Sequence, residues 1–89
     1  MAERRLLIQN KLGLHARASA KLASEAGRFA AEVTLAKGDV EVNGKSIMGI
    51  MMLAAAKGSE LCVRAEGADA EEALNAIEAL VNDRFGEEQ

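Results

Sequence analysis

Apolar residues recur in this chain with two different periods, and the change from one to the other constrains the fold most. Leu61, Val63 and Ala65 alternate with more polar neighbours, as in a strand with one buried face. From residue 70 onward the spacing becomes three to four residues, as on one side of a helix. The positions of this second stripe are Ala70, Ala73, Leu74, Ile77, Leu80, Val81 and Phe85. A strand followed so closely by an amphipathic helix indicates a sheet covered by helices.

The same two patterns predict the other elements, with Gly38-Asp39 as a hairpin turn and with Val40 and Val42 pointing inward. The predicted order is β-α-β-β-α-β-α. Because the strands are half polar, we predict an α+β two-layer fold with helices on one face of an antiparallel sheet. A chain of 89 residues suits one domain, expected to span 1–89. The predicted strands are 4–9, 31–37, 40–42 and 61–66, and the predicted helices are 16–26, 47–56 and 70–85.

Several residues at the predicted helix ends are typical caps. Ser46 and Asp69 are N-cap residue types, and Glu72 makes the Asp69 segment resemble a capping box. Gly27 and Gly86 are predicted to end the first and last helices. Local sequence therefore predicts where these helices begin and end.

Charge is distributed unevenly along the chain. Residues 1–58 hold nine Lys and Arg against five Asp and Glu, whereas residues 59–89 hold two against nine. A basic first half would suit an acidic protein partner, because complementary charge speeds and orients encounter. A solvated surface of mixed charge is the alternative. The net charge of −3 and the scarcity of aromatic residues argue against nucleic-acid binding.

Other features bear on the compartment. The single cysteine, Cys62, cannot form an internal disulfide, which fits a reducing environment. The N-terminal residues lack the apolar run of a signal peptide, and no stretch is long enough to span a bilayer. We therefore expect a cytoplasmic protein without membrane insertion.

His15 is the only histidine, and it directly precedes the first predicted helix. The first N–H groups of a helix have no intrahelical acceptor and carry partial positive charge, so they suit a phosphate. The amides of Ala16, Arg17 and Ala18 would form such a cradle, and the Arg17 guanidinium matches phosphate oxygens. We predict that His15 is a nucleophile toward phosphorus; an incidental surface histidine is the alternative.

Other chemistry at His15 has less support. A metal site is not expected, because there is no second histidine and Cys62 falls on a distant predicted strand. A Ser-His-Asp arrangement would need an oxyanion hole and a substrate pocket, of which the sequence carries no sign. We predict neither a metal nor a cofactor.

Ser46 combines two possible roles at the start of the second predicted helix. As an N-cap it would stabilise that helix. Its hydroxyl, beside Lys45, is also a phosphorylation target, and a phosphate there would add roughly −2 charge while suiting the helix dipole. Both roles can hold at once.

The helix that follows Ser46 is apolar on every side. A domain of this size cannot cover all of it, so Ile47, Met48 and Met51 are expected to be partly exposed. Flexible methionines on an exposed patch suit docking to several partners, and ordinary core packing is the alternative. The residues expected to face the sheet are Ile50, Leu53 and Ala54.

Two segments at a fixed spacing resemble the HPr family, the histidine phosphocarriers of the bacterial phosphoenolpyruvate-dependent phosphotransferase system. They are Asn10-Lys11-Leu12-Gly13-Leu14-His15-Ala16-Arg17 and Gly44-Lys45-Ser46-Ile47-Met48-Gly49-Ile50-Met51. The similarity extends over essentially the whole chain, including 56–58 and 67–69. It implies an open-faced β-sandwich, with four antiparallel strands and three helices on one side.

The resemblance also implies a role for each matching residue. His15 would accept a phosphoryl group on Nδ1 from phosphorylated enzyme I and pass it to an enzyme IIA domain, with Arg17 stabilising the phosphate. Ser46 would be the target of HPr kinase/phosphorylase. The protein would be a monomeric carrier rather than a stand-alone enzyme. The implied docking residues are Leu14, Ala20, Lys21, Ser24, Ile47, Met48 and Met51.

Ala18 departs from the family pattern, because many relatives have proline there. Alanine gives up some rigidity in the first turn but adds an amide to the cradle. The segment 10–13 resembles the nitrogen-related branch, whereas the Ser46 segment resembles carbohydrate-type members, so both branches stay open. Two other functions also stay open: a module that binds partners without phosphotransfer, and a hydrolase with His15 as its base.

Overall fold

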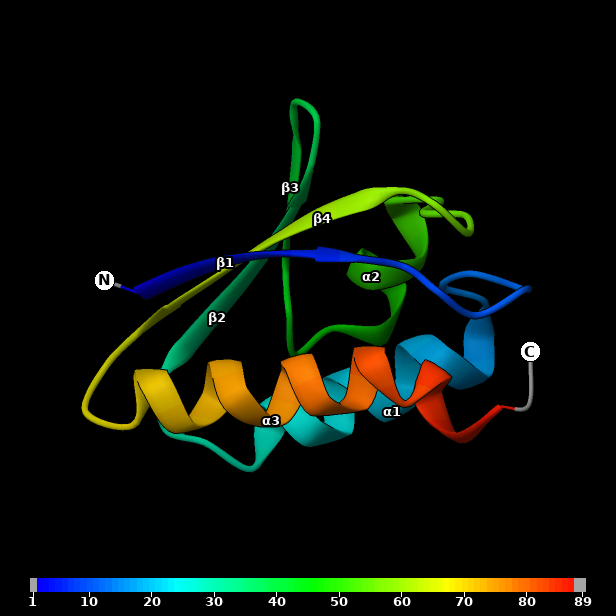
Figure 1. Cartoon of the computed structure of the whole chain (residues 1–89). Helices are drawn as coiled ribbons and strands as arrows, with labels where there is room; N and C mark the ends of the chain where they lie inside the picture. Colours follow the sequence, from blue (N-terminus) through cyan, green and yellow to red (C-terminus); the bar gives the residue numbers. More distant parts are fainter. Residues whose placement is uncertain (1, 88–89) are drawn as a thin grey trace.

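The computed structural model describes residues 2–87 and has two layers, a sheet and a set of helices (Figure 1). The sheet has four antiparallel strands in the order β1-β4-β2-β3, and the element order confirms the predicted β-α-β-β-α-β-α fold. The strands are β1 (Ala2–Leu7), β2 (Glu32–Lys37), β3 (Val40–Asn43) and β4 (Glu60–Glu66), and the helices are α1 (Ala16–Gly27), α2 (Ile47–Met52), α3 (Ala70–Asn82) and the 3₁₀ turn η1 (Arg84–Gly86).

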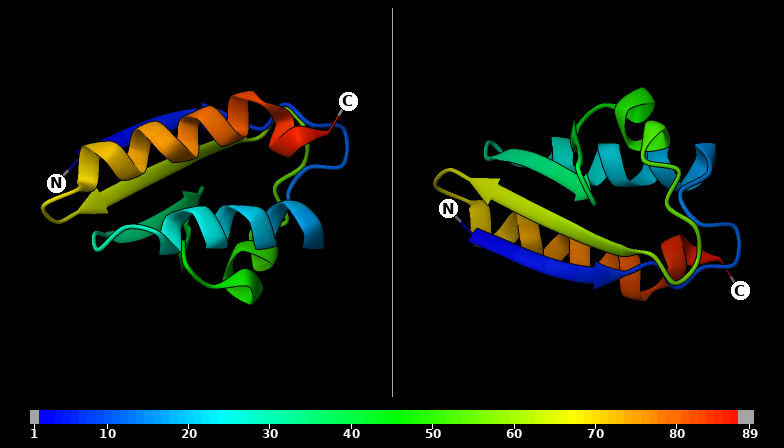
Figure 2. Two further views of the ribbon diagram at one scale, coloured as in Figure 1. Left: turned by 90° about the horizontal axis from the view of Figure 1, so that it is seen from below. Right: turned by 90° about the horizontal axis from the view of Figure 1, so that it is seen from above.

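Helices α1 and α3 lie side by side under one face of the sheet, with α3 along β1 and β4 and α1 closer to β2 (Figure 2). The core between the layers is apolar. Each buried aliphatic or aromatic side chain contributes about 1.5–3 kcal/mol of stability relative to exposure. The largest of these fully buried side chains are Phe85, Ile8, Leu22, Leu35, Ile50, Leu61, Leu74 and Ile77.

The short hairpin between β2 and β3 forms as predicted, with Lys37 paired to Val40 across the Gly38-Asp39 turn. Gly38 supplies the positive φ (59°) that this turn requires. The prediction that Val40 points into the core is wrong, because its side chain is 48% exposed. β3 is an edge strand, so its outer residues have no layer to pack against.

Helix α2 is shorter than predicted, ending at Met52 instead of residue 56. Ala54 adopts a left-handed φ of 50° and is exposed, which corrects the expectation that it faces the sheet. Two carbonyls at this helix end, those of Leu53 and Ala54, accept from Lys37 Nζ at 3.4 and 3.2 Å. If α2 were longer, these two carbonyls would accept hydrogen bonds within the helix. Here Lys37 of β2 donates to them instead.

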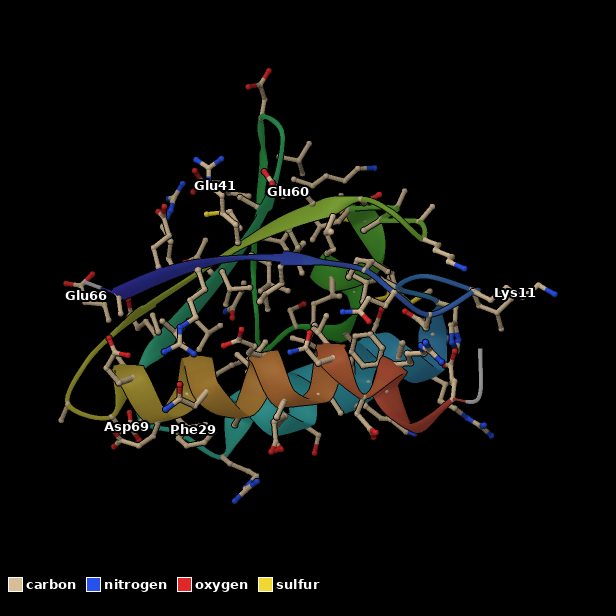
Figure 3. The ribbon with its side chains drawn as sticks, viewed as in Figure 1. Lys11, Phe29, Glu41, Glu60, Glu66 and Asp69 are labelled. Carbon is tan, nitrogen blue, oxygen red and sulfur yellow. The ribbon has the colours of Figure 1, made fainter. Side chains whose placement is uncertain are left out.

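Asp69 does not form the predicted capping box. Its carboxylate accepts instead from the backbone N–H groups of Ala30 and Ala31, at 2.9 and 2.8 Å. The Ala30 N–H is the main cause that lowers the pKa of Asp69, while partial burial opposes it. Figure 3 shows Asp69 and Phe29 at the same end of the molecule, far from Lys11. Asp69 therefore ties the start of α3 to the loop after α1.

Two helix ends also differ from prediction. Gly27 is the last residue of α1 instead of its cap, and the cap is Arg28 in ordinary helical conformation. Helix α3 ends at Asn82, and Phe85 reaches the core only through the following turn. Arg84 and Phe85 have left-handed φ values of 54° and 56°, ahead of Gly86. This turn brings the chain back toward α1.

Candidate functional site

His15 is the N-cap of α1, in extended conformation (φ −73°, ψ −179°). Its carbonyl accepts the first helical hydrogen bond, from Ser19 N at 2.8 Å, but its side chain does not cap the helix. Within residues 2–87, the N–H groups of Ala16, Arg17 and Ala18 donate to no group outside the helix. Ala16 and Arg17 are exposed, so their two amides are accessible to an anion, whereas Ala18 is 0% exposed and its amide is not open to solvent.

The loop before His15 is held tightly. Gly13 has φ +66°, and a Cβ there would collide with the carbonyl of Ala55. Leu14 N donates to that same carbonyl at 2.9 Å. The buried side chains of Asn10 and Ser19 close the loop by donating to Gly13 O (2.8 Å) and Leu14 O (3.1 Å). Glycine is required at position 13, and the start of α1 is consequently fixed in place.

The His15 ring pairs with the carboxylate of Glu87. Nε2 lies 2.5 Å from Glu87 Oε2, and the two side chains are 28% and 16% exposed. An ionised carboxylate can only accept, so Nε2 carries the proton. When the imidazole is neutral, its lone pair is then on Nδ1.

The Glu87 carboxylate is ionised at neutral pH. Partial burial raises its pKa, but the hydrogen bonds from His15 and Asn10, together with the nearby charge of Lys21, outweigh burial and lower the pKa overall. Asn10 Nδ2 donates to Glu87 Oε1 at 3.1 Å. The carboxylate therefore has one oxygen on the imidazole and the other on a buried amide.

Two basic side chains of α1 differ in their contacts. Arg17 is exposed and, in the part of the chain that the structure describes, makes no hydrogen bond or ion pair. Lys21, one turn further on, donates from Nζ to Phe85 O at 2.6 Å. The Arg17 guanidinium is consequently available to an incoming anion, whereas Lys21 Nζ is already engaged.

Ser46 is the N-cap of α2, as predicted. Its Oγ accepts from Gly49 N at 3.1 Å, and its carbonyl accepts from Ile50 N at 3.0 Å. Ser46 is half-buried. Its hydroxyl nevertheless lies at the edge of the apolar surface that α2 presents.

Helix α2 presents an apolar surface to solvent, as predicted, with Ile47, Met48 and Met51 exposed by 44, 73 and 41%. Met52 (74%) and Leu12 (67%) are also exposed, and the sequence analysis did not single them out. The four exposed residues of α2 (Ile47, Met48, Met51 and Met52) are called the apolar patch below. Because Gly13 contacts the Ala55 segment just after α2, the patch lies beside the loop that carries His15.

Comparison with known proteins identifies the family. Residues 2–83 match the family described as "PTS HPr component phosphorylation site". The chain belongs to the HPr family. It is 53% identical over 87 residues to the phosphocarrier protein HPr of Neisseria meningitidis, covering 98% of each chain. A crystal structure of HPr from Thermoanaerobacter tengcongensis superposes with a TM-score of 0.96, at 43% identity and full coverage of both chains.

HPr proteins are phosphocarriers of the phosphotransferase system. The site residues predicted from the sequence are of two kinds, those around His15 and those expected to dock partner proteins. His15, Arg17 and the two exposed amides of Ala16 and Arg17 lie at the start of α1. Of the predicted docking residues, Leu14 is only 5% exposed and packs in the core, so its side chain offers little surface. Ala20 is half-buried and Ser24 is exposed on α1.

Glu87, whose carboxylate contacts His15 at the candidate site, was missed by the sequence analysis. It lies 72 positions from His15, in an acidic segment with no motif. No group of three or more His, Cys, Asp and Glu within the described residues could hold a metal ion. None of the helices in that same part of the chain is long and apolar enough to cross a bilayer.

Proposed function

We propose that His15 accepts a phosphoryl group on Nδ1 from phosphorylated enzyme I and passes it to an enzyme IIA domain. The observation that carries this proposal is the hydrogen bond from Nε2 to Glu87, which leaves Nδ1 as the nucleophile. The residues that follow His15 in the chain support it further, because the exposed amides of Ala16 and Arg17 and the Arg17 side chain have no partner among residues 2–87. The site thus offers both a nucleophile and donors for the phosphate oxygens.

The reaction is an in-line displacement at phosphorus. The Nδ1 lone pair forms the new N–P bond while the bond between phosphorus and the donor breaks, and the Nε2 proton stays in place. The Arg17 guanidinium and the exposed amides of Ala16 and Arg17 stabilise the charge on the phosphoryl oxygens. The carrier contributes positioning and charge, and the partner proteins supply the rest of each active site.

The test is labelling with phosphoenolpyruvate and a cognate enzyme I. The wild-type chain should gain one acid-labile phosphate, and His15→Ala should gain none. A matched control is Glu72→Gln, which alters an exposed residue of α3 distant in sequence from the site and should label normally. Equal labelling of His15→Ala would refute the proposal. Labelled protein that never passes phosphate to an enzyme IIA domain would favour an interaction module over a carrier.

We further propose that the apolar patch and the basic first half of the chain dock both partners, through apolar contact and attraction to acidic partner surfaces. This suits a cytoplasmic monomer that dissociates after each transfer. The rate of phosphoryl transfer from enzyme I should therefore fall as the salt concentration rises, because salt screens exposed charges.

Ser46 is, in this proposal, the site at which HPr kinase/phosphorylase regulates docking. A negative charge there would oppose an acidic partner at the margin of the apolar patch. Ser46→Asp should keep its fold, because Asp is an equally good N-cap, and should accept phosphate from enzyme I roughly tenfold more slowly. Ser46→Asn, a neutral N-cap, is the control. Equal rates for all three proteins at every ionic strength would mean that Ser46 is only a cap.

A further inference from the structure

The segment after α3 turns back and ends on His15. Figure 1 shows this end of the chain beside the start of α1. Phe85 is fully buried, and its carbonyl accepts from Lys21 Nζ at 2.6 Å. Arg84 and Phe85 hold left-handed conformations, each costing about 1–2 kcal/mol in a residue other than glycine. Burial of Phe85 offsets that cost, so the path of residues 83–87 is imposed by the core.

Glu87 is bound on both carboxylate oxygens at the end of this path. Oε2 accepts from His15 Nε2 at 2.5 Å, and Oε1 accepts from Asn10 Nδ2 at 3.1 Å. Asn10 is itself 0% exposed and also donates to Gly13 O at 2.8 Å. A single buried amide therefore links the carboxylate to the loop that places His15.

We propose that Glu87 is a positioning residue that keeps the His15 proton on Nε2 throughout the phosphoryl cycle. This proposal rests on the function proposed for His15. Its lowered pKa keeps Glu87 ionised, and a carboxylate can only accept a hydrogen bond from the ring. In many proteins a carboxylate accepts a hydrogen bond from one ring nitrogen of a histidine and thereby fixes its tautomer and orientation.

Both directions of transfer depend on this proton. In acceptance, the Nδ1 lone pair forms the N–P bond, the donor's bond to phosphorus breaks, and the ring becomes an imidazolium paired with Glu87. In donation, the electrons of the N–P bond return to Nδ1, and a neutral imidazole leaves with its proton still on Nε2. A ring protonated on Nδ1 would lack the attacking lone pair. A phosphorylated ring without the Nε2 proton would have to leave as an anion.

The tautomer can be measured without any phosphotransfer, by long-range ¹H–¹⁵N NMR of the His15 ring in the unphosphorylated protein. Wild type should show the proton on Nε2, protected from exchange with water. Glu87→Leu should expose that proton to exchange and raise the Nδ1–H fraction several-fold. Glu87→Gln, whose carbonyl still accepts, should retain the wild-type tautomer. Unchanged spectra in Glu87→Leu would overturn the proposal.

Transfer kinetics separate positioning from docking. Glu87→Gln should lower kcat for transfer from enzyme I about tenfold, because charge on the developing imidazolium is no longer paired, and Glu87→Leu should lower it further. KM for the carrier should not change, since Glu87 is only 16% exposed. A rise in KM alone would contradict the proposal. Absence of label in wild type would refute the function of His15, and the NMR result would still decide the role of Glu87.

Discussion

Helices α1 and α2 begin in opposite ways. At α2 the Ser46 hydroxyl accepts from Gly49 N at 3.1 Å, so the helix supplies its own acceptor. At α1 the N-cap is His15, whose ring turns away to Glu87 and accepts nothing from the helix. A side-chain N-cap contributes about 1 kcal/mol, and α1 forgoes it.

The difference separates a structural helix start from a functional one. Donors satisfied within the fold hold α2 in place. The open N–H donors at α1 can still bind an anion. The preceding loop holds the start of α1 in place without using them. Gly13, Asn10 and Ser19 fix that loop through contacts and hydrogen bonds that do not use the amides of residues 16–18.

The largest expected effect tests whether the loop holds α1. Gly13→Ala places a methyl group against the Ala55 carbonyl in a left-handed conformation, and should destabilise the protein by about 2–4 kcal/mol in urea unfolding. Gly27→Ala is the matched control at the other end of α1, where a Cβ meets nothing within 4 Å. It should be neutral or stabilise by about 0.5–1 kcal/mol. Similar free energies of unfolding for the two variants would mean that the loop at Gly13 does not hold the start of α1.

A smaller effect tests the open donors at α1. Arg17→Ala should slow phosphoryl transfer to His15 about tenfold, or about 1.4 kcal/mol, because one charged donor for the phosphate is lost. Stability should change by less than about 0.5 kcal/mol, since Arg17 is exposed and unpaired among residues 2–87. Arg28→Ala, at the far end of α1, should transfer at the wild-type rate. Unchanged kinetics in Arg17→Ala would remove the proposed role of its guanidinium.

Local features of this fold were predictable from the sequence because they depend on residues close together in the chain. The switch of apolar period identified the layers, and the hydroxyl of Ser46 identified the start of α2. Exposure of Met48 and Met51 followed from the small size of the domain, and the structure confirms it.

What escaped prediction depends on tertiary contacts. Asp69 is a typical N-cap residue, but its carboxylate accepts from two backbone N–H groups of the loop after α1 instead of capping α3. Helix α2 ends at Met52, after which Ala54 takes a left-handed conformation and Lys37 of β2 donates to the carbonyls of Leu53 and Ala54. Glu87 meets His15 only because Phe85 anchors the last turn in the core. No periodic pattern encodes a pairing of this kind.

The smallest expected effect tests the closed start of α2. Ser46→Ala removes the acceptor for Gly49 N and should destabilise the protein by about 1 kcal/mol in urea unfolding. Ser46→Asp should restore that stability, because its carboxylate can accept from the same amide. Phosphorylation of His15 in Ser46→Ala should proceed at the wild-type rate, since the lost hydrogen bond lies in α2 and adds no charge. Slower transfer in Ser46→Ala would mean that the two helix starts are coupled, and that capping α2 also shapes the surface on which partners dock.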